Sequence, residues 1–315
     1  MFHGKISAPI AEGLQELRKR IDAAKIPSSR LDETLNLATW NIREFGKKRR
    51  SEAAIHYIAE ILGQFDLISL VELRDDLTDL GRVLPILGPY WRAVYSDIIP
   101  DAGGNMERIG FLYDKRAVAF TGLAAAANPP RKKSGKEYVP EFTWWRSPYM
   151  ASFSAGNFDF VVSTAHIRWG DSKEARTAEI RSFADWLDLK RRQKHAEDKD
   201  FIVTGDFNIE TSAMYEALTG KGLVAPTALR KGAFGTNLAK DKRYDQIVHY
   251  PIYADSFMNK GGVLDFFTGG IEPLFPGMSK DDFTYQLSDH LPLWVQINTD
   301  NDGHQLDQII RSRRD

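Results

Sequence analysis

Short apolar runs with strand character recur along almost the whole chain, and they constrain the fold more than any other feature. The clearest are LNLATW (35–40), DLISLVE (66–72), YWRAVYS (90–96), IGFLY (109–113), FDFVVSTAH (158–166), DFIVTGD (200–206), QIVHY (246–250) and LPLWVQI (291–297). Several are almost continuously apolar, which is typical of strands in a sheet covered on both faces. Charged helical stretches separate some runs, at 52–62 and 172–195, while others are joined by turns alone. This mixture predicts an α/β sandwich with mixed sheets rather than a purely parallel, doubly wound fold.

The organisation of the chain favours one large domain with two extensions. The 315 residues, 43% of them hydrophobic, are enough for one large core. Residues 10–25 place apolar side chains at helical spacing, namely Leu14, Leu17, Ile21 and Ala24, so we expect a helix packed against the domain. The sequence therefore predicts a helical extension (1–33), a domain (34–298) and a polar tail (299–315).

Charge and cysteine content limit the classes of partner and chemistry. The net charge is −1, so a phosphate-rich partner must meet a local basic surface. The chain has no cysteine, which excludes disulfides, thiolate nucleophiles and cysteine-ligated zinc. No apolar run approaches the roughly 20 residues of a membrane helix, and the first residues lack a signal-peptide core. These features favour a cytoplasmic protein without excluding secretion, and they imply no obligate protein partner.

Polar residues suited to metal or phosphoryl chemistry stand at the ends of the apolar runs. They are Asn41, Glu72, His166, Asp206, Asn208, Asp245, Asp289 and His290. Strand termini on a rigid scaffold are a usual place for functional groups. Taken one at a time they indicate little, because a Gly-Asp pair after a strand is most often a turn and a lone histidine is most often structural. If the strand ends converge, however, they form a cleft with carboxylates, imidazoles and amides together.

Hydrolysis of a phosphoric ester is the chemistry that needs this mixture. Hard oxygen ligands such as Glu72 and Asp289 suit Mg²⁺ or Mn²⁺, which offsets charge in the transition state. A histidine oriented by a carboxylate can move protons near neutral pH. Amides such as Asn41 and Asn208 can donate hydrogen bonds without adding charge.

Seven motifs, in order, resemble the endonuclease/exonuclease/phosphatase superfamily, and within it the deoxyribonuclease I branch most. They are WN (40–41), LVELR (70–74), ERIGFLYD (107–114), TAHIRWG (164–170), TGDFN (204–208), RYDQIV (243–248) and SDHLP (288–292). The match spans residues 37–297. It implies a four-layer sandwich in which helices cover two packed mixed β-sheets, with the site at one edge.

The resemblance also implies roles for the polar residues at the centre of the site. Glu72 and Asp289 would hold the metal ion, with Asn41 beside the ion and the phosphate. Asp206 and Asn208 would face the scissile phosphate. The ion would be Mg²⁺ or Mn²⁺, and a structural Ca²⁺ site is left open.

Two histidine–carboxylate pairs follow from the same resemblance. Glu107 would pair with His166, and Asp245 would pair with His290. A carboxylate partner raises imidazole basicity and fixes the tautomer. The two histidines would share acid and base duties, and Asp206 remains a rival base.

Three arginines are candidate substrate contacts: Arg74 in LVELR, Arg108 beside Glu107, and Arg146 in FTWWRSPYMASF (142–153), which resembles the branch's phosphate-contact segment. One departure concerns Asn105, which stands where the branch carries a tyrosine that contacts the minor groove. The basic clusters KKRR (47–50) and RKKSGK (131–136) are expected in loops, where they are either solvated surface or phosphate contacts.

These observations favour a metal-dependent phosphodiesterase, specifically an endonuclease that cleaves DNA with little sequence preference. One alternative keeps the chemistry and changes the substrate to a phospholipid headgroup, a small phosphorylated molecule or RNA. Another is a non-catalytic binding protein on the same fold, since a fold alone does not fix function.

Overall fold

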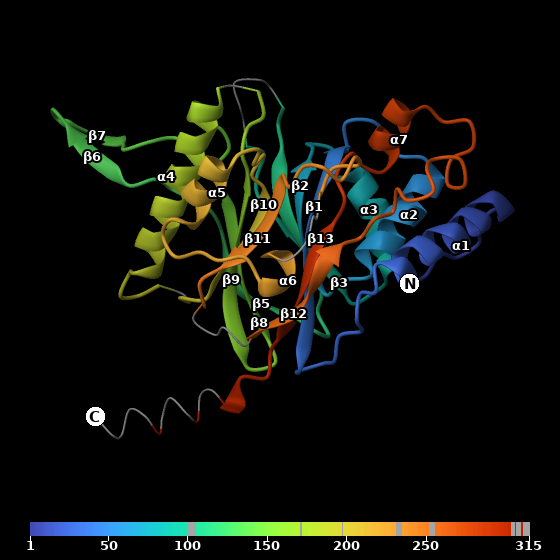
Figure 1. The fold of residues 1–315 in the computed structure, drawn as a ribbon, viewed down its shortest axis with the longest axis horizontal. Helices are drawn as coiled ribbons and strands as arrows, with labels where there is room; N and C mark the ends of the chain where they lie inside the picture. Colours follow the sequence, from blue (N-terminus) through green and yellow to red (C-terminus); the bar gives the residue numbers. More distant parts are fainter. Residues whose placement is uncertain are drawn as a thin grey trace.

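Two β-sheets pack face to face and helices cover both outer faces (Figure 1). The computed structural model describes residues 1–99, 105–170, 172–196, 198–230, 235–251, 256–303, 306 and 310, without the side chain of residue 258. Each sheet contains parallel and antiparallel pairs. The predicted four-layer α/β sandwich with mixed sheets is therefore confirmed.

The first sheet has six strands in the order β12-β13-β1-β2-β4-β3. Their bounds are β12 Phe257–Val263, β13 Leu293–Asn298, β1 Thr34–Phe45, β2 Leu67–Leu73, β4 Arg108–Asp114 and β3 Trp91–Tyr95. The helices on its outer face are α1 Ala8–Ala23, α2 Glu52–Leu62, α3 Thr78–Leu87 and α7 Lys280–Gln286. β1 lies at the centre, parallel to β2 and antiparallel to β13, which is the last strand along the chain.

The second sheet has five strands in the order β11-β10-β9-β8-β5. Their bounds are β11 Asp245–His249, β10 Phe201–Asp206, β9 Phe158–His166, β8 Tyr149–Ala155 and β5 Ala119–Ala126. Helices α4 Lys173–Arg191 and α5 Ser212–Thr219 cover its outer face, and the short α6 Thr227–Arg230 contacts β12. A separate hairpin consists of β6 Arg131–Ser134 and β7 Glu137–Pro140.

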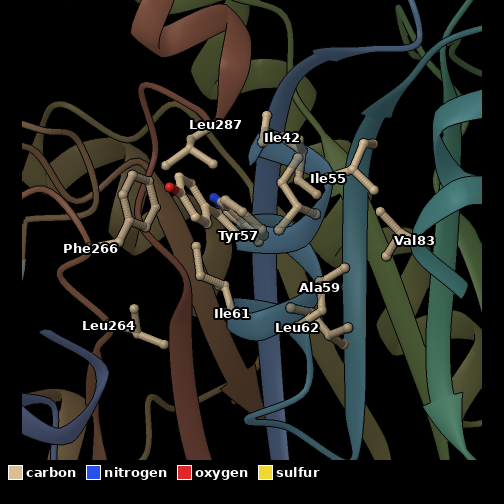
Figure 2. Close-up of a cluster of buried hydrophobic side chains, with 14 of the residues drawn as sticks. Ile42, Ile55, Tyr57, Ala59, Ile61, Leu62, Val83, Leu264, Phe266 and Leu287 are labelled. Atoms are coloured by element: carbon tan, nitrogen blue, oxygen red, sulfur yellow. The ribbon is translucent and has the colours of Figure 1, made fainter. Parts of the chain in front are cut away.

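Three buried apolar clusters separate the four layers. Along β1, Leu35 and Leu37 face the other sheet, whereas Ala38 and Trp40 face the helices. Figure 2 shows the cluster on the helix side. Because side chains alternate along a strand, Asn41 shares the inter-sheet face with Leu35 and Leu37. The alternation thus directs the polar end of β1 into the layer between the sheets.

Several predictions of local structure need correction. Residues 131–136 were expected in a loop, but 131–134 form β6, and β5 extends to Ala126. The expectation was wrong because both faces of this hairpin are exposed, so it has no apolar alternation to detect. The sequence also indicated neither β12 nor the helices α3, α5 and α7.

The N-terminal helix packs as expected, since Leu14, Leu17 and Ile21 are buried in the cluster on the helix side. The proposed boundaries at 33/34 and 298/299 stay predictions, and much of the tail at 299–315 lies outside the described residues. Among the described helices, none combines the length and the apolar character needed to cross a bilayer.

Gly205 is required by the close approach of β10 to its parallel neighbour β9. Its φ is +124°, and a Cβ there would lie 2.1 Å from the carbonyl oxygen of Ala165. We expect Gly205→Ala to lower the free energy of unfolding by about 3 kcal/mol, because it combines a disfavoured backbone conformation with a backbone clash. Urea unfolding of Gly205→Ala and of the wild type measures this loss.

Gly122→Ala is the matched control. Gly122 has a similar φ of +119°, but a Cβ added there would meet no other atom within 4 Å. The control should lose only about 1–2 kcal/mol, the cost of the backbone conformation alone. Equal losses in the two variants would show that contact with β9 is not the cause.

Candidate active site

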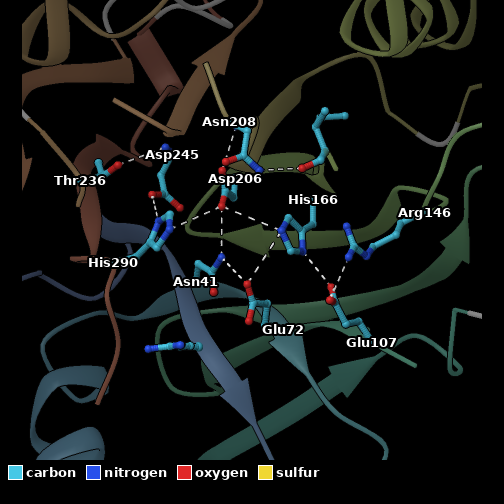
Figure 3. Close-up of polar contacts among 12 residues, drawn as sticks. Asn41, Glu72, Glu107, Arg146, His166, Asp206, Asn208, Thr236, Asp245 and His290 are labelled. Carbon is cyan, nitrogen blue, oxygen red and sulfur yellow. Dashed lines mark hydrogen bonds and ion pairs between the residues drawn. The ribbon is translucent and has the colours of Figure 1, made fainter. Parts of the chain in front are cut away.

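The predicted polar residues converge at one end of the layer between the two sheets (Figure 3). Asn41 comes from the first sheet, and His166 and Asp206 come from the second. Deeper in the same layer, the hydroxyl of Thr204 bonds those of Ser69 at 2.9 Å and Thr164 at 2.7 Å. The apolar core therefore becomes polar before it reaches the site.

A backbone irregularity places Glu72 among these groups. The register of β2 shifts between Leu70 and Leu73, and Glu72 has a φ of +63°. Its Oε1 accepts a hydrogen bond from Asn41 Nδ2 at 2.9 Å, and its Oε2 accepts one from the backbone N–H of Glu44 at 2.8 Å. A non-glycine residue at positive φ costs on the order of 1 kcal/mol, and such strain is concentrated at functional sites.

The first predicted histidine–carboxylate pair is present in the geometry. His166 Nδ1 lies 2.8 Å from Glu107 Oε2. Glu107 Oε1 accepts hydrogen bonds from Arg146 at 3.0 Å and Arg74 at 3.4 Å. Burial alone would raise the pKa of Glu107, but His166 and the two arginines outweigh it and lower this pKa to about 2. Burial would lower the pKa of His166, and Glu107 outweighs it, so that pKa is raised.

The second predicted histidine–carboxylate pair, His290 with Asp245, is also in hydrogen-bond contact. His290 Nδ1 lies 2.7 Å from Asp245 Oδ2, and both side chains are buried. Burial would lower the pKa of His290, but the carboxylates of Asp245 and Asp206 outweigh it and raise this pKa to about 10. His290 is therefore protonated at neutral pH.

Asp206 lies between the two histidines. Its Oδ2 is 3.9 Å from His166 Nε2 and 3.8 Å from His290 Nε2, and it accepts a hydrogen bond from Asn41 Nδ2 at 3.1 Å. Its Oδ1 accepts one from the backbone N–H of Asn208 at 2.9 Å. The Asn208 amide donates to the carbonyl of Ile167 at 2.7 Å, which ties the loops after β9 and β10 together.

The groups predicted to hold a divalent ion are chemically suited to it. Glu72 Oε1 accepts a hydrogen bond from the Asn41 amide nitrogen, and Asn41 Oδ1 is buried with no hydrogen-bond partner among the described residues. Asp289 is half-buried, and its charge raises the pKa of Arg43 and of His290. Hard oxygen donors of this kind fit Mg²⁺ or Mn²⁺.

A second group of close ligand atoms has a different explanation. Among the described residues, Asp206, Asp245 and His290 place ligand atoms within 4.8 Å of one another. Asp245 and Asp206 raise the pKa of His290 to about 10, and His290 Nδ1 already bonds Asp245, so these charges favour an ion pair among the three groups. This group is therefore better explained as an ion-paired histidine.

A pocket of about 360 Å³ opens beside His166. Its lining includes two predicted substrate contacts, Arg74 and Arg146, as well as Asn105, Trp145 and Trp169. The third predicted substrate contact, Arg108, does not line this pocket. Its guanidinium donates to the carbonyl of Ser96 at 2.9 Å. The structure thus brings two of the three predicted arginines to the pocket.

Sequence comparison places this site in a known family. Residues 38–290 match the Endonuclease/Exonuclease/phosphatase family. The chain belongs to this family.

Individual relatives in the family are distant. The chain is 28% identical to a deoxyribonuclease from Thioalkalivibrio sp. (strain K90mix), over 86% of this chain and 72% of that protein. It is 25% identical to deoxyribonuclease-1 from Bos taurus, over 84% of this chain and 92% of that protein. The structure of a mannosyl-6-phosphatase from Bacteroides thetaiotaomicron superposes with a TM-score of 0.53 at 18% identity, covering 84% of this chain and 99% of that one. At this identity the structural likeness shows the fold alone.

Some contacts of this endonuclease/exonuclease/phosphatase site were not predicted from the sequence. The Ser288 hydroxyl donates to the carbonyl of Asn41 at 2.6 Å and accepts from the backbone N–H of His290 at 3.0 Å. Thr236 Oγ1 accepts from the backbone N–H of Asp245 at 3.1 Å. Ser288 stands in the SDHLP motif, which is a usable signal, whereas nothing in the sequence around Thr236 indicates its contact.

The raised pKa of His290 gives a signed prediction for stability. A group whose pKa is about 10 when folded and about 6.5 when unfolded stabilises the fold fully below pH 6.5 and loses that contribution as the pH rises towards 10. We expect the stability difference between wild type and His290→Gln, measured by urea unfolding in EDTA, to shrink by about 3 kcal/mol between pH 7 and pH 9.5. Exposed His195→Gln is the control, with a difference that stays constant. A constant difference for His290→Gln as well would contradict the prediction.

Proposed function

We propose that the protein is a divalent-metal-dependent phosphodiesterase that acts as an endonuclease, hydrolysing DNA with little sequence preference. The observation that carries the proposal is the placement of His166 and His290. Each bonds a buried carboxylate through Nδ1, and each Nε2 lies within 3.9 Å of Asp206 Oδ2. Two proton-transfer groups therefore approach one point from opposite sides, as an in-line displacement at phosphorus requires.

The two histidines would divide the proton transfers. His166, with Asp206 beside it, would take a proton from the attacking water as the new P–O bond forms. His290 would give the proton on Nε2 to the leaving ester oxygen as the other P–O bond breaks. This division is proposed from charge: Asp245 and Asp206 raise the pKa of His290 to about 10, whereas the positive charge of Arg146 opposes the effect of Glu107 on the pKa of His166.

The oxygens of Glu72, Asn41 and Asp289 would hold the divalent ion. When bound, the ion would offset negative charge on the phosphate. Hydrogen bonds from Asn41 and from the backbone N–H of Glu44 orient the Glu72 carboxylate.

The pocket beside His166 supports a nucleic-acid substrate. Arg74 and Arg146 line it and supply positive charge, and the guanidinium of Arg168 lies 3.5 Å from the ring centre of Trp145. Trp169 is 53% exposed on the same pocket, where a flat ring can stack on a base. Both histidines keep their carboxylate partners, which supports an enzyme over a non-catalytic binding protein on this fold.

The test is incubation of supercoiled plasmid with Mg²⁺ or Mn²⁺ at several salt concentrations. We expect conversion to nicked circles that EDTA abolishes. Parallel reactions with single-stranded RNA, p-nitrophenyl phosphate and phospholipid vesicles separate the nuclease from other phosphoesterases. No nicking by the wild type under any metal or salt condition would overturn the endonuclease proposal.

A further inference from the structure

The hairpin of β6 and β7 stands apart from both sheets. Among the described strands, these two pair only with each other, and residues 131–138 are all exposed. Figure 1 shows the hairpin projecting outward past α4. An isolated two-stranded hairpin without an apolar face gains little stability of its own. Its side chains therefore do not serve the core and are available to a partner.

The strand register gives the hairpin one basic and aromatic face. Arg131 pairs with Pro140, and Lys133 pairs with Tyr138. Because side chains alternate along each strand, Arg131, Lys133 and Tyr138 lie on the same face. Tyr138 is 65% exposed there. Cations beside an exposed aromatic ring suit a nucleic-acid backbone.

Charge on the hairpin contrasts with the rest of the chain. Residues 131–140 carry four cations and one carboxylate, a net charge of +3, whereas the whole chain has −1. The four cations are Arg131, Lys132, Lys133 and Lys136. This is the local basic surface that a nearly neutral protein needs to attract a polyanion.

Both ends of the hairpin are fixed to α4. The indole N–H of Trp186 donates to the carbonyl of Asn128 at 3.0 Å, and the backbone N–H of Trp145 donates to Glu179 at 2.9 Å. The ring of Trp144 packs edge-on against Trp186, with 5.6 Å between ring centres. Since Trp145 also lines the pocket beside His166, the base of the hairpin is held in place relative to the site.

Chain length limits how far the basic face lies from the reacting phosphate. Arg146 follows Tyr138 by eight positions, and a chain of that length spans at most roughly 28 Å. One helical turn of B-DNA is about 34 Å. We propose that the face formed by Arg131, Lys133 and Tyr138 binds the phosphate backbone of duplex DNA within about one helical turn of the bond that is cut. This inference rests on the proposed function.

The experiment compares two double variants with the same charge change. Arg131→Gln/Lys133→Gln removes the cations of the proposed face, and Lys132→Gln/Lys136→Gln removes two cations elsewhere on the hairpin. Binding of a fluorescent 30-base-pair duplex is measured by anisotropy in EDTA, so that no hydrolysis occurs. We expect the first variant to bind about 10-fold more weakly in 0.1 M salt, with the slope of log Kd against log salt reduced by about 2. The second variant should lose no more than about 3-fold.

Two further measurements locate the contact. We expect an 8-base-pair duplex to be too short to reach from the site to the hairpin, so the first variant should bind it with the wild-type affinity. The first variant should also cleave bis(p-nitrophenyl) phosphate at the wild-type rate. Equal weakening by both double variants would overturn the assigned face. Wild-type affinity and salt slope in the first variant would overturn the inference as a whole.

The two proposals fail separately. If the wild type binds the long duplex but nicks no DNA with any metal, the endonuclease proposal fails, and a loss of binding in the first variant still supports the hairpin contact. If the wild type nicks plasmid and the first variant matches it in affinity and salt slope, only the hairpin inference fails.

Discussion

Replacing either active-site histidine by glutamine is expected to slow plasmid nicking by about 10²–10⁴-fold, the range for loss of a general acid or base. His290→Gln removes the Nε2 proton that would be given to the leaving oxygen, while Asp245 bonds the opposite ring nitrogen, Nδ1. His166→Gln removes the group that would accept the proton of the attacking water. Glutamine can keep one hydrogen bond to the partner carboxylate, and the rates are compared under conditions in which each variant is folded. Initial rates on supercoiled plasmid measure the effect.

His249→Gln provides a matched control. His249 is also a buried histidine of the second sheet, at the end of β11, and its Nδ1 bonds the carbonyl of Tyr250 outside the site. It should nick at close to the wild-type rate. Because the proposed mechanism has both histidines act on one displacement, the double variant should lose much less than the product of the single losses. Undiminished nicking by either single variant would remove that histidine from the mechanism.

Glu72→Gln is expected to lower nicking by about 10²–10³-fold and to raise the Mn²⁺ concentration needed for half-maximal rate. Glutamine has one acceptor oxygen, so it can keep only one of the two hydrogen bonds that Glu72 accepts from Asn41 and from the backbone of Glu44, and it also removes the negative charge offered to the ion. Mn²⁺ binding followed by electron paramagnetic resonance gives a readout that does not depend on turnover.

Two comparisons make this result interpretable. Glu33→Gln, an exposed carboxylate before β1, should bind Mn²⁺ as the wild type does. Asp289→Asn should weaken binding as Glu72→Gln does, which tests the second predicted ligand. Unchanged Mn²⁺ affinity in Glu72→Gln would exclude this carboxylate as a ligand.

The sequence predicted the central strands well because burial on both faces leaves an apolar signature. LNLATW lies in β1, and FIVTGD of the run DFIVTGD lies in β10; β10 ends at Asp206, whereas β1 continues past Asn41 to Phe45. Elements with little burial, such as β6 and β7, leave no such signature and were missed. Propensity alone does not specify a strand whose pairing is local and exposed.

Some features of the site could likewise be predicted from the sequence, and others could not. The face on which Asn41 lies could be inferred from the chain alone, because side chains alternate along a strand, although β1 continues past Asn41 to Phe45 instead of ending there. The pairing of Glu107 with His166 joins residues 59 positions apart, and only the family resemblance indicated it. The bonds of Thr236 and Ser288 depend on loop conformations that no periodic pattern encodes.

The position of β13 has a consequence for synthesis of the protein. The central strand β1 pairs with β13, from Thr34 opposite Asn298 to Thr39 opposite Leu293. β1 is made early in translation, but it cannot form this pairing until β13 has been made much later. His290 and Asp289 stand just before β13 and leave the ribosome at the same late stage. Pairing across such a separation is slow to form. A nascent chain therefore has neither its complete first sheet nor His290 until β13 has been made, and we expect the activity proposed above to appear only after that point.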